Sequence, residues 1–219
     1  WAFSDPAEPD SVVLGRQTPS GRVDEGSRVA NDRDFDVRNT RLDARLDFRN
    51  ADDLTLTLSG GFSRVSNIGI GGGGAEQVED WTYSYFKGGV NHGALFVQAF
   101  LNRNDSGNTY LLRNGDRLID HSTQFVTQAQ HGITVWGGRQ RLTYGVDVLL
   151  TRPDTRFTVH GRNEDGDNVD EIGVYMQSET DLSDGVKFVA AGRVDDHSFV
   201  GDRVFSPRAA LVFTPKEDH

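Results

Sequence analysis

Apolar and polar residues alternate along most of the chain from Asp34 onward. In TRLDARLDF, residues 40–48, every second residue is apolar, from Leu42 to Phe48, and the intervening positions carry charges. The segment LTLTLSGGF, residues 54–62, repeats the pattern after a turn at NADD, residues 50–53. A period of two is typical of a strand with one apolar and one polar face. The pattern therefore predicts an antiparallel hairpin of two long strands.

The same alternation predicts seven further strands, although the parity around Phe86 and Lys87 is left open. They lie at about residues 81–90, 94–102, 124–136, 141–150, 171–182, 186–195 and 204–214. The expected strands run roughly nine to fifteen residues, whereas a strand of a soluble protein averages about five or six. A tilted strand needs about nine to eleven residues to cross a bilayer. These lengths favour membrane-crossing strands.

The connections between the expected strands alternate in length. Tight turns are expected at Asn50, Asn91, Gly137 and Ser183, and long polar loops at 67–80, 103–122 and 151–170, with an intermediate connection at 197–203. Short turns at one end and long loops at the other are typical of outer-membrane barrels. We therefore expect an all-β fold, an antiparallel transmembrane β-barrel segment, with its long loops outside the cell and its short turns in the periplasm.

Aromatic residues are expected near both ends of these strands. Phe48, Trp136 and Phe213 fall at the short-turn ends, and Phe62, Trp81 and Phe205 at the long-loop ends. Two aromatic belts around an apolar band suit the two interfaces of a membrane. Core aromatics of a soluble β-sandwich are the alternative interpretation.

Composition narrows the class of protein. A mean hydropathy of −0.53 agrees with a barrel, because only alternate residues of each strand meet lipid. The formal net charge of −10 and the scattered Lys and Arg residues argue against nucleic-acid partners and a polybasic membrane tether. The absence of Cys excludes disulfides and thiolate chemistry. No apolar run approaches a membrane helix, and no signal peptide begins at Trp1.

Residues 1–33 differ from the rest of the chain. Pro, Gly, Ser and Asp are frequent there, and apolar residues do not recur with a regular period. We interpret them as an extracellular loop segment with a candidate strand at Val12–Leu14. Residues 34–219 are then a partial barrel.

Two pieces of the last third carry a family resemblance. EIGVYMQSETDLSDGVKFVAAGRVD, residues 171–195, and FSPRAALVFTP, residues 205–215, closely resemble the barrel of TonB-dependent outer-membrane receptors. Weaker similarity extends through LTYGVDVLLTRPDT and LFVQAFLNRNDSGNTYLLRNG. The resemblance implies a receptor in the Gram-negative outer membrane that actively imports a scarce ligand, such as a siderophore, cobalamin or an oligosaccharide. Its implied partners are outer-membrane lipid, the receptor's own plug domain and the TonB complex, with no cofactor and no enzymatic activity.

The chain departs from the family pattern in two respects. No segment resembles the plug or the stretch that contacts TonB, and the chain ends in PKEDH where these receptors end in an aromatic residue. About nine strands are expected here, against about 22 in the family, so we expect a segment of a larger barrel. The alternative is a self-contained barrel of eight to ten strands, a passive pore or anchor that uses Val12–Leu14 as an additional strand.

Candidate functional residues follow from the polar parity and the loops. The residues expected to face the lumen are Asp43, Arg45, Asp47, Gln177, Glu179, Arg193, Asp195 and Arg208. Such charges more often form cross-strand ion pairs than contact a substrate or plug. Ligand binding is assigned to the loops 67–80, 103–122 and 151–170 without individual contact residues.

Several motifs resemble functional sites but have simpler interpretations. GIGGGG matches the dinucleotide pattern at Gly69, Gly71 and Gly74, but AEQVEDW predicts a strand where a helix is needed, so a mobile surface loop is preferred. NEDGDNVDE, residues 163–171, could bind calcium but lacks EF-hand spacing. The six His residues show no zinc motif, and no G-x-S-x-G elbow occurs. The sequence therefore predicts no metal site and no catalytic residue.

Overall fold

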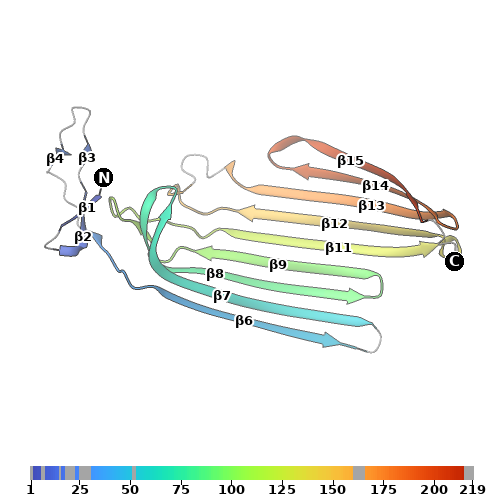
Figure 1. Cartoon of the computed structure of the whole chain (residues 1–219), viewed down its shortest axis with the longest axis horizontal. Helices are drawn as coiled ribbons and strands as arrows, with labels where there is room; N and C mark the ends of the chain where they lie inside the picture. The colour runs from blue at the N-terminus through green and yellow to red at the C-terminus, as the bar shows by residue number, and fades with distance from the viewer. Residues whose placement is uncertain are drawn as a thin grey trace.

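The computed structural model is built almost entirely from antiparallel strands (Figure 1). It describes residues 2–5, 8–14, 16–17, 23–24, 31–50, 53–159 and 166–214. A 3₁₀ turn, η1, lies at Trp136–Gly138. No helix of the described residues is long and apolar enough to cross a membrane.

Nine long strands form one sheet in which each strand pairs with its neighbour in sequence (Figure 1). The short strand β10 adds to the outer part of β8 and brings the sheet to ten strands. This meander is the all-β antiparallel arrangement that the alternation predicted. The strands are β6 (Arg38–Arg49), β7 (Leu54–Gly71), β8 (Gly74–His92), β9 (Leu95–Asp105), β10 (Tyr110–Leu111), β11 (Thr123–Val135), β12 (Gln140–Arg152), β13 (Val169–Ser183), β14 (Val186–His197) and β15 (Val200–Phe213).

Short strands near the N-terminus form two small sheets. β1 (Ala2–Asp5), β2 (Glu8–Leu14) and β5 (Asn31–Asp32) make one, and β3 (Arg16–Gln17) with β4 (Val23–Asp24) makes the other. The expected strand at Val12–Leu14 is the end of β2. Within the described residues β2 pairs with β1 and β5, and not with the main sheet.

The register of the main sheet separates an apolar face from a polar face. One row of directly paired residues contains Phe48, Leu56, Val90, Val97, Ala129, Val146, Val174, Val194 and Phe205. The adjacent row contains Asp47, Thr57, Gly89, Gln98, Gln128, Asp147, Gly173 and Asp195. Directly paired residues share a face, so the predicted two-faced alternation is confirmed. The same pairing places Phe86 on the apolar face and Lys87 on the polar face.

The tight turns lie where the sequence predicted them. Gly93 and Ala94 connect β8 to β9, η1 lies between β11 and β12, and Asp184 with Gly185 connects β13 to β14. These turns lie at the same end of the sheet in Figure 1. The first turn, after Asn50, includes residues that lie outside the described ranges.

Two predictions about the opposite end are wrong. Residues 67–80 are not a mobile loop, because β7 and β8 continue past a register shift near Val65 to a two-residue turn at Gly72 and Gly73. β10 pairs with the outer part of β8 and extends the sheet there. The connection expected at 197–203 is also shorter than predicted, since only Ser198 and Phe199 separate β14 from β15. β7 and β8, 18 and 19 residues long, therefore exceed the expected strand lengths.

The two remaining outer connections are long, as expected, but each is shorter than predicted at its ends. β9 continues to Asp105, β12 continues to Arg152, and β13 begins at Val169. The connections therefore comprise residues 106–122, which include β10, and 153–168, of which 160–165 lie outside the described ranges.

The sheet has no apolar core of its own. In the described part of the chain the buried apolar side chains are Val78, Leu111 and Leu112, all near the outer connections. The apolar face is open, with Met176 58% and Phe205 63% exposed. A single layer with one large apolar face needs lipid or a second layer against it. One expected belt residue lies elsewhere: Trp81 pairs with Val65 in the parity of the polar face.

Candidate functional site

The polar face brings together all of the residues that the sequence assigned to a lumen. Pairing places them on one face, on strands β6, β13, β14 and β15: Asp43, Arg45, Asp47, Gln177, Glu179, Arg193, Asp195 and Arg208. Arg208 makes no ion pair within the described part of the chain. Arg45 binds Asp47 of its own strand at 2.8 Å, so this pair runs along the strand and not across it as expected.

An ionic cluster centred on Arg193 joins β12 to β14 across β13. Its Nη1 lies 2.6 Å from Asp147 Oδ2 on β12, and its Nε lies 2.7 Å from Asp195 Oδ1 on β14. Gly173 of β13 stands directly between the two carboxylates in the register. The guanidinium therefore spans β13 and binds both carboxylates, because the intervening position carries no side chain.

Tyr175 extends this cluster toward β11. Its ring lies 5.8 Å from the Arg193 Cζ, and its hydroxyl donates a hydrogen bond to Gln130 Oε1 at 2.9 Å. Tyr175, Gly145 and Gln130 are consecutive partners on β13, β12 and β11. The phenol thus passes over Gly145 to reach the second strand along.

The same arrangement recurs on the other side of the sheet. Tyr85, Gly61 and Asp43 are consecutive partners on β8, β7 and β6, and the Tyr85 hydroxyl donates to Asp43 Oδ1 at 2.9 Å. Arg41 binds the second oxygen of this carboxylate at 2.6 Å. Two tyrosines over glycines therefore each lock three strands together on the polar face.

Between the ionic clusters lies a band of uncharged side chains. β9 and β11 are both fully described. The polar residues on their polar face carry amide or hydroxyl groups, and none of them is charged. Gln98 donates to Gln128, and Asn102 Nδ2 donates to Gln124 Oε1 at 3.3 Å. Neither the band nor its amide pairs were predicted, although the sequence pattern QFVTQAQ on alternating positions was a usable signal.

The outer connections interlock into one hydrogen-bonded unit. Buried Ser106 accepts a bond from Asp120 N at 2.9 Å and donates to Leu118 O at 2.9 Å. Thr109, fully buried, accepts from Glu79 N at 3.2 Å and so ties this connection to the β7–β8 hairpin. Thr158 accepts from Ile119 N at 2.9 Å and joins the third connection. The described parts of the three predicted ligand loops therefore act as one structure, which we call the loop unit.

Gln77 anchors the segment before β6 to the loop unit. Its side chain, 1% exposed, accepts from Asp34 N at 2.9 Å and donates to Asp34 O at 3.1 Å. The neighbouring Glu76 lies against the hairpin glycines, and partial burial raises the pKa of its carboxyl. The sequence gives no signal for the role of either residue, because both lie in a segment predicted to be a mobile loop.

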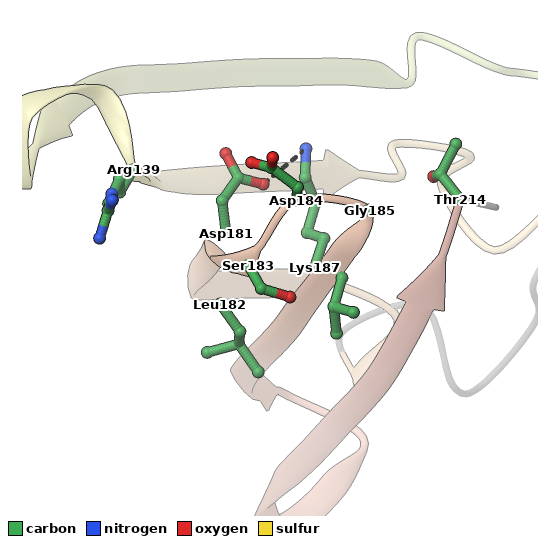
Figure 2. Close-up of a pocket in the computed structure, with 9 residues that line it drawn as sticks. Arg139, Asp181, Leu182, Ser183, Asp184, Gly185, Lys187 and Thr214 are labelled. Carbon is green, nitrogen blue, oxygen red and sulfur yellow. Dashed lines mark ion pairs between the residues drawn. The ribbon is translucent and has the colours of Figure 1, made fainter. Parts of the chain in front are cut away.

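A hollow of about 590 Å³ lies at the short-turn end, between Arg139, Lys187 and Thr214 (Figure 2). Lys187 Nζ is 3.7 Å from Glu179 and 3.8 Å from Asp181. The hollow follows the β13–β14 turn, and Thr214 N donates to Gly185 O at 2.8 Å. Its lining comes from the β13–β14 turn and the strand ends beside it, and its lysine is already paired with two carboxylates.

The glycine-rich motif is part of a hairpin, and no metal site is found among the described residues. Gly69, Gly71 and Gly74 lie at the tip of the β7–β8 hairpin, where a strand and no helix follows. In the described residues no three His, Asp or Glu side chains converge as metal ligands. The acidic segment 163–171 lies partly outside the described ranges, which resume at residue 166.

A meander of long strands with one exposed apolar face and one polar face defines a membrane β-barrel segment. The model of the family described as "TonB dependent receptor-like, beta-barrel" matches residues 2–219, and the chain belongs to this family. The predicted resemblance is thereby confirmed, and the family is one of outer-membrane transport receptors rather than enzymes. No curated protein and no solved structure matched the chain.

Proposed function

We propose that this chain is part of a receptor that actively imports a scarce ligand across the outer membrane of a Gram-negative bacterium. The observation that carries the proposal is the open apolar face, which runs uninterrupted from Phe48 on β6 to Phe205 on β15. In water such a face would drive aggregation, whereas lipid covers it at no cost. The ligand class is a siderophore, cobalamin or an oligosaccharide.

The opposite, polar face lines the lumen in this proposal. Arg45, Asp47, Gln177, Glu179, Arg193, Asp195 and Arg208 then face the interior, and their ion pairs keep the wall solvated. The outer backbone edges of β6 and β15 lack a partner strand in the described residues. Unpaired backbone groups cost several kcal/mol each in hydrocarbon, so in this proposal further strands pair with these edges; the family resemblance implies about 22 strands in the closed barrel.

The loop unit is the proposed ligand-capturing surface. Residues 67–80, 103–122 and 151–170 contribute to it, and residues 1–33 form an extracellular segment before the partial barrel of 34–219. The interlocking bonds of Ser106, Thr109 and Thr158 support a preorganised surface. A plug domain and the TonB complex are the proposed partners that supply gating and energy, and the receptor works without a cofactor.

Uptake measurements test the proposal. Cells that carry or lack the complete gene would be given labelled ferric siderophores, cobalamin and oligosaccharides, with and without a functional TonB. We expect one class to accumulate only when both the gene and TonB are present. Accumulation that persists without TonB would contradict active import.

The alternative of a small closed barrel makes a different structural demand. It requires β15 to pair with β6 or with a strand from the N-terminal segment. In the described residues β2 pairs with β1 and β5, and β15 pairs only with β14. TonB-independent diffusion of small solutes would be its signature.

Orientation has its own test, which the absence of Cys makes simple. In whole cells an impermeant maleimide should label Cys introduced at Gly72 or Asn108 of the loop unit. It should not label Cys at Asp184, in the β13–β14 turn. The further expected positions Asp165, outside the cell, and Asp52, in the periplasm, lie outside the described residues. Labelling at Asp184 with protection at Asn108 would invert the orientation.

A further inference from the structure

A hollow of about 260 Å³ lies where the polar face meets the loop unit. Five strands or connections contribute to it, from β8 to the end of β12. Its lining comprises Tyr83, Asn102, Arg103, Asn104, Ser122, Thr123, Gln124 and Thr151. It is smaller than the hollow at the turn end, but every lining residue except Arg103 carries an amide or hydroxyl group.

The lining side chains form an incomplete hydrogen-bond chain. Asn102 Nδ2 donates to Gln124 Oε1 at 3.3 Å, and Gln124 Nε2 donates to Thr151 Oγ1 at 3.4 Å. Both distances exceed the usual length of such bonds. Within the described residues, the Tyr83 hydroxyl and the Asn102 carbonyl oxygen have no hydrogen-bond partner, so both remain available to a ligand. The Thr151 hydroxyl accepts a bond and keeps its own hydrogen to donate.

The electrostatics of the hollow disfavour a charged ligand. Asp120, beside it, already accepts from Asn104 Nδ2 at 3.3 Å and from Ser122 N at 2.8 Å. Arg103 also contributes to the lining, although its parity in the register places it on the opposite face of β9. The side chains that form the hydrogen-bond chain of the hollow, Asn102, Gln124 and Thr151, are uncharged, and a charged group that left water to bind them alone would not recover its lost hydration.

We propose that this hollow binds an uncharged, hydroxyl-rich group, a saccharide unit, as the first lumen-side contact of the ligand. Each amide offers both a donor and an acceptor, which is the pairing that adjacent hydroxyls require. Tyr83, 41% exposed, adds a flat apolar ring for the C–H face of a pyranose. This inference rests on the proposed function and selects the oligosaccharide class from the three candidates.

Binding measurements on the protein expressed from its complete gene test the inference. Calorimetric titration in lauryldimethylamine oxide, a detergent without sugar, would compare neutral tetrasaccharides of glucose, mannose, xylose and galactose with tetragalacturonate and ferric desferrioxamine. Galactose and galacturonate chains share their ring stereochemistry and differ in charge. We expect at least one neutral tetrasaccharide to bind and tetragalacturonate to bind at least tenfold more weakly.

Variants locate the binding to the hollow. Gln124→Leu and Tyr83→Ala should each weaken saccharide binding tenfold or more, while Tyr83→Phe, which keeps the ring, should weaken it less than Tyr83→Ala. Gln140→Leu, which removes an amide at the short-turn end, should leave binding unchanged. Heat-modifiable gel mobility confirms that each variant is folded. Binding that is confined to the charged or ferric probes, absent altogether, or insensitive to Gln124 and Tyr83 overturns the proposal.

Saccharide binding in the hollow and active import can be refuted independently of each other. TonB-dependent uptake of a ferric complex, unaffected by Gln124→Leu, would refute the saccharide hollow and leave active import intact. Saccharide binding that depends on Gln124 together with TonB-independent uptake would refute active import and leave the hollow intact.

Discussion

Tyr175 lies directly opposite Gly145 and covers it with its phenol ring. A Cβ at Gly145 would stand 2.5 Å from Tyr175 Cζ and 2.6 Å from Ala129 O, closer than real Cβ contacts. The ring therefore requires glycine at this position, and its hydroxyl is thereby able to reach Gln130. Gly61 has the same relation to Tyr85, with the ring Cε1 2.9 Å from the position of a Cβ.

Gly145→Ala should destabilise the assembled barrel by about 1–3 kcal/mol, because a methyl group overpacks a site bounded on one side by backbone. The measurement is equilibrium unfolding in lipid bilayers. Gly89→Ala is the matched control on the same face, where the nearest atoms to a Cβ lie at 3.8 and 3.9 Å. Equal costs at the two glycines would show that the Tyr175 ring is not held over Gly145.

Arg193→Gln should also destabilise the barrel, by about 1–3 kcal/mol, since it removes the charged partner of two carboxylates. Asp147 and Asp195 would then face each other across Gly173 without a counter-charge. Adding Asp147→Asn to the Arg193→Gln variant should restore part of the loss, because the remaining like-charge repulsion disappears. The same bilayer unfolding assay applies, and a double variant less stable than Arg193→Gln alone would contradict this account.

Arg substitutions should distinguish the two faces. Arg at Leu56, Val146, Met176 or Leu211, all on the apolar face, should cost about 2–4 kcal/mol near the bilayer midplane. Arg at Thr57 or Gln177 on the polar face should cost much less. Asp147 is unsuitable as a control, because Arg there would face Arg193. Folding into bilayers gives the free energies, and equal costs on the two parities would refute the lipid assignment.

Glu76 should make the outer hairpin sensitive to pH. Because burial raises the pKa of this carboxyl, the folded hairpin is most stable below the unfolded-state pKa of about 4.3 and loses that stability as pH rises through the raised value. Glu76→Gln should remove this dependence and stabilise the hairpin at neutral pH. Hydrogen exchange of the amides in 69–78, corrected for intrinsic rates, measures the effect, with exposed Asp202→Asn as the control substitution. An unchanged pH dependence in Glu76→Gln would exclude Glu76 as its cause.

Much of the sheet could be predicted from the sequence because strand faces follow a local rule. Successive side chains point to opposite sides, so the order of Leu42, Asp43, Ala44 and Arg45 already assigns each residue to a face. The tight turns at Gly93 and Gly185 were equally local, since both take positive φ values that glycine adopts readily. The family followed from the residues of β13 to β15.

The tertiary structure alone decided which residues meet across the strands. Nothing local to Gly145 announces that Tyr175 will cover it, and nothing near Gln77 announces its bonds to Asp34, 43 residues away. The prediction of a mobile loop at 67–80 is wrong for the same reason. Its glycines indicate mobility, but β10 and the buried Thr109 hydrogen-bond to this hairpin and hold it in place. The amide-lined hollow likewise depends on residues of separate strands that only the pairing brings together. Alternation along one strand is a property of neighbouring residues, whereas register is settled by the summed energy of contacts between distant segments.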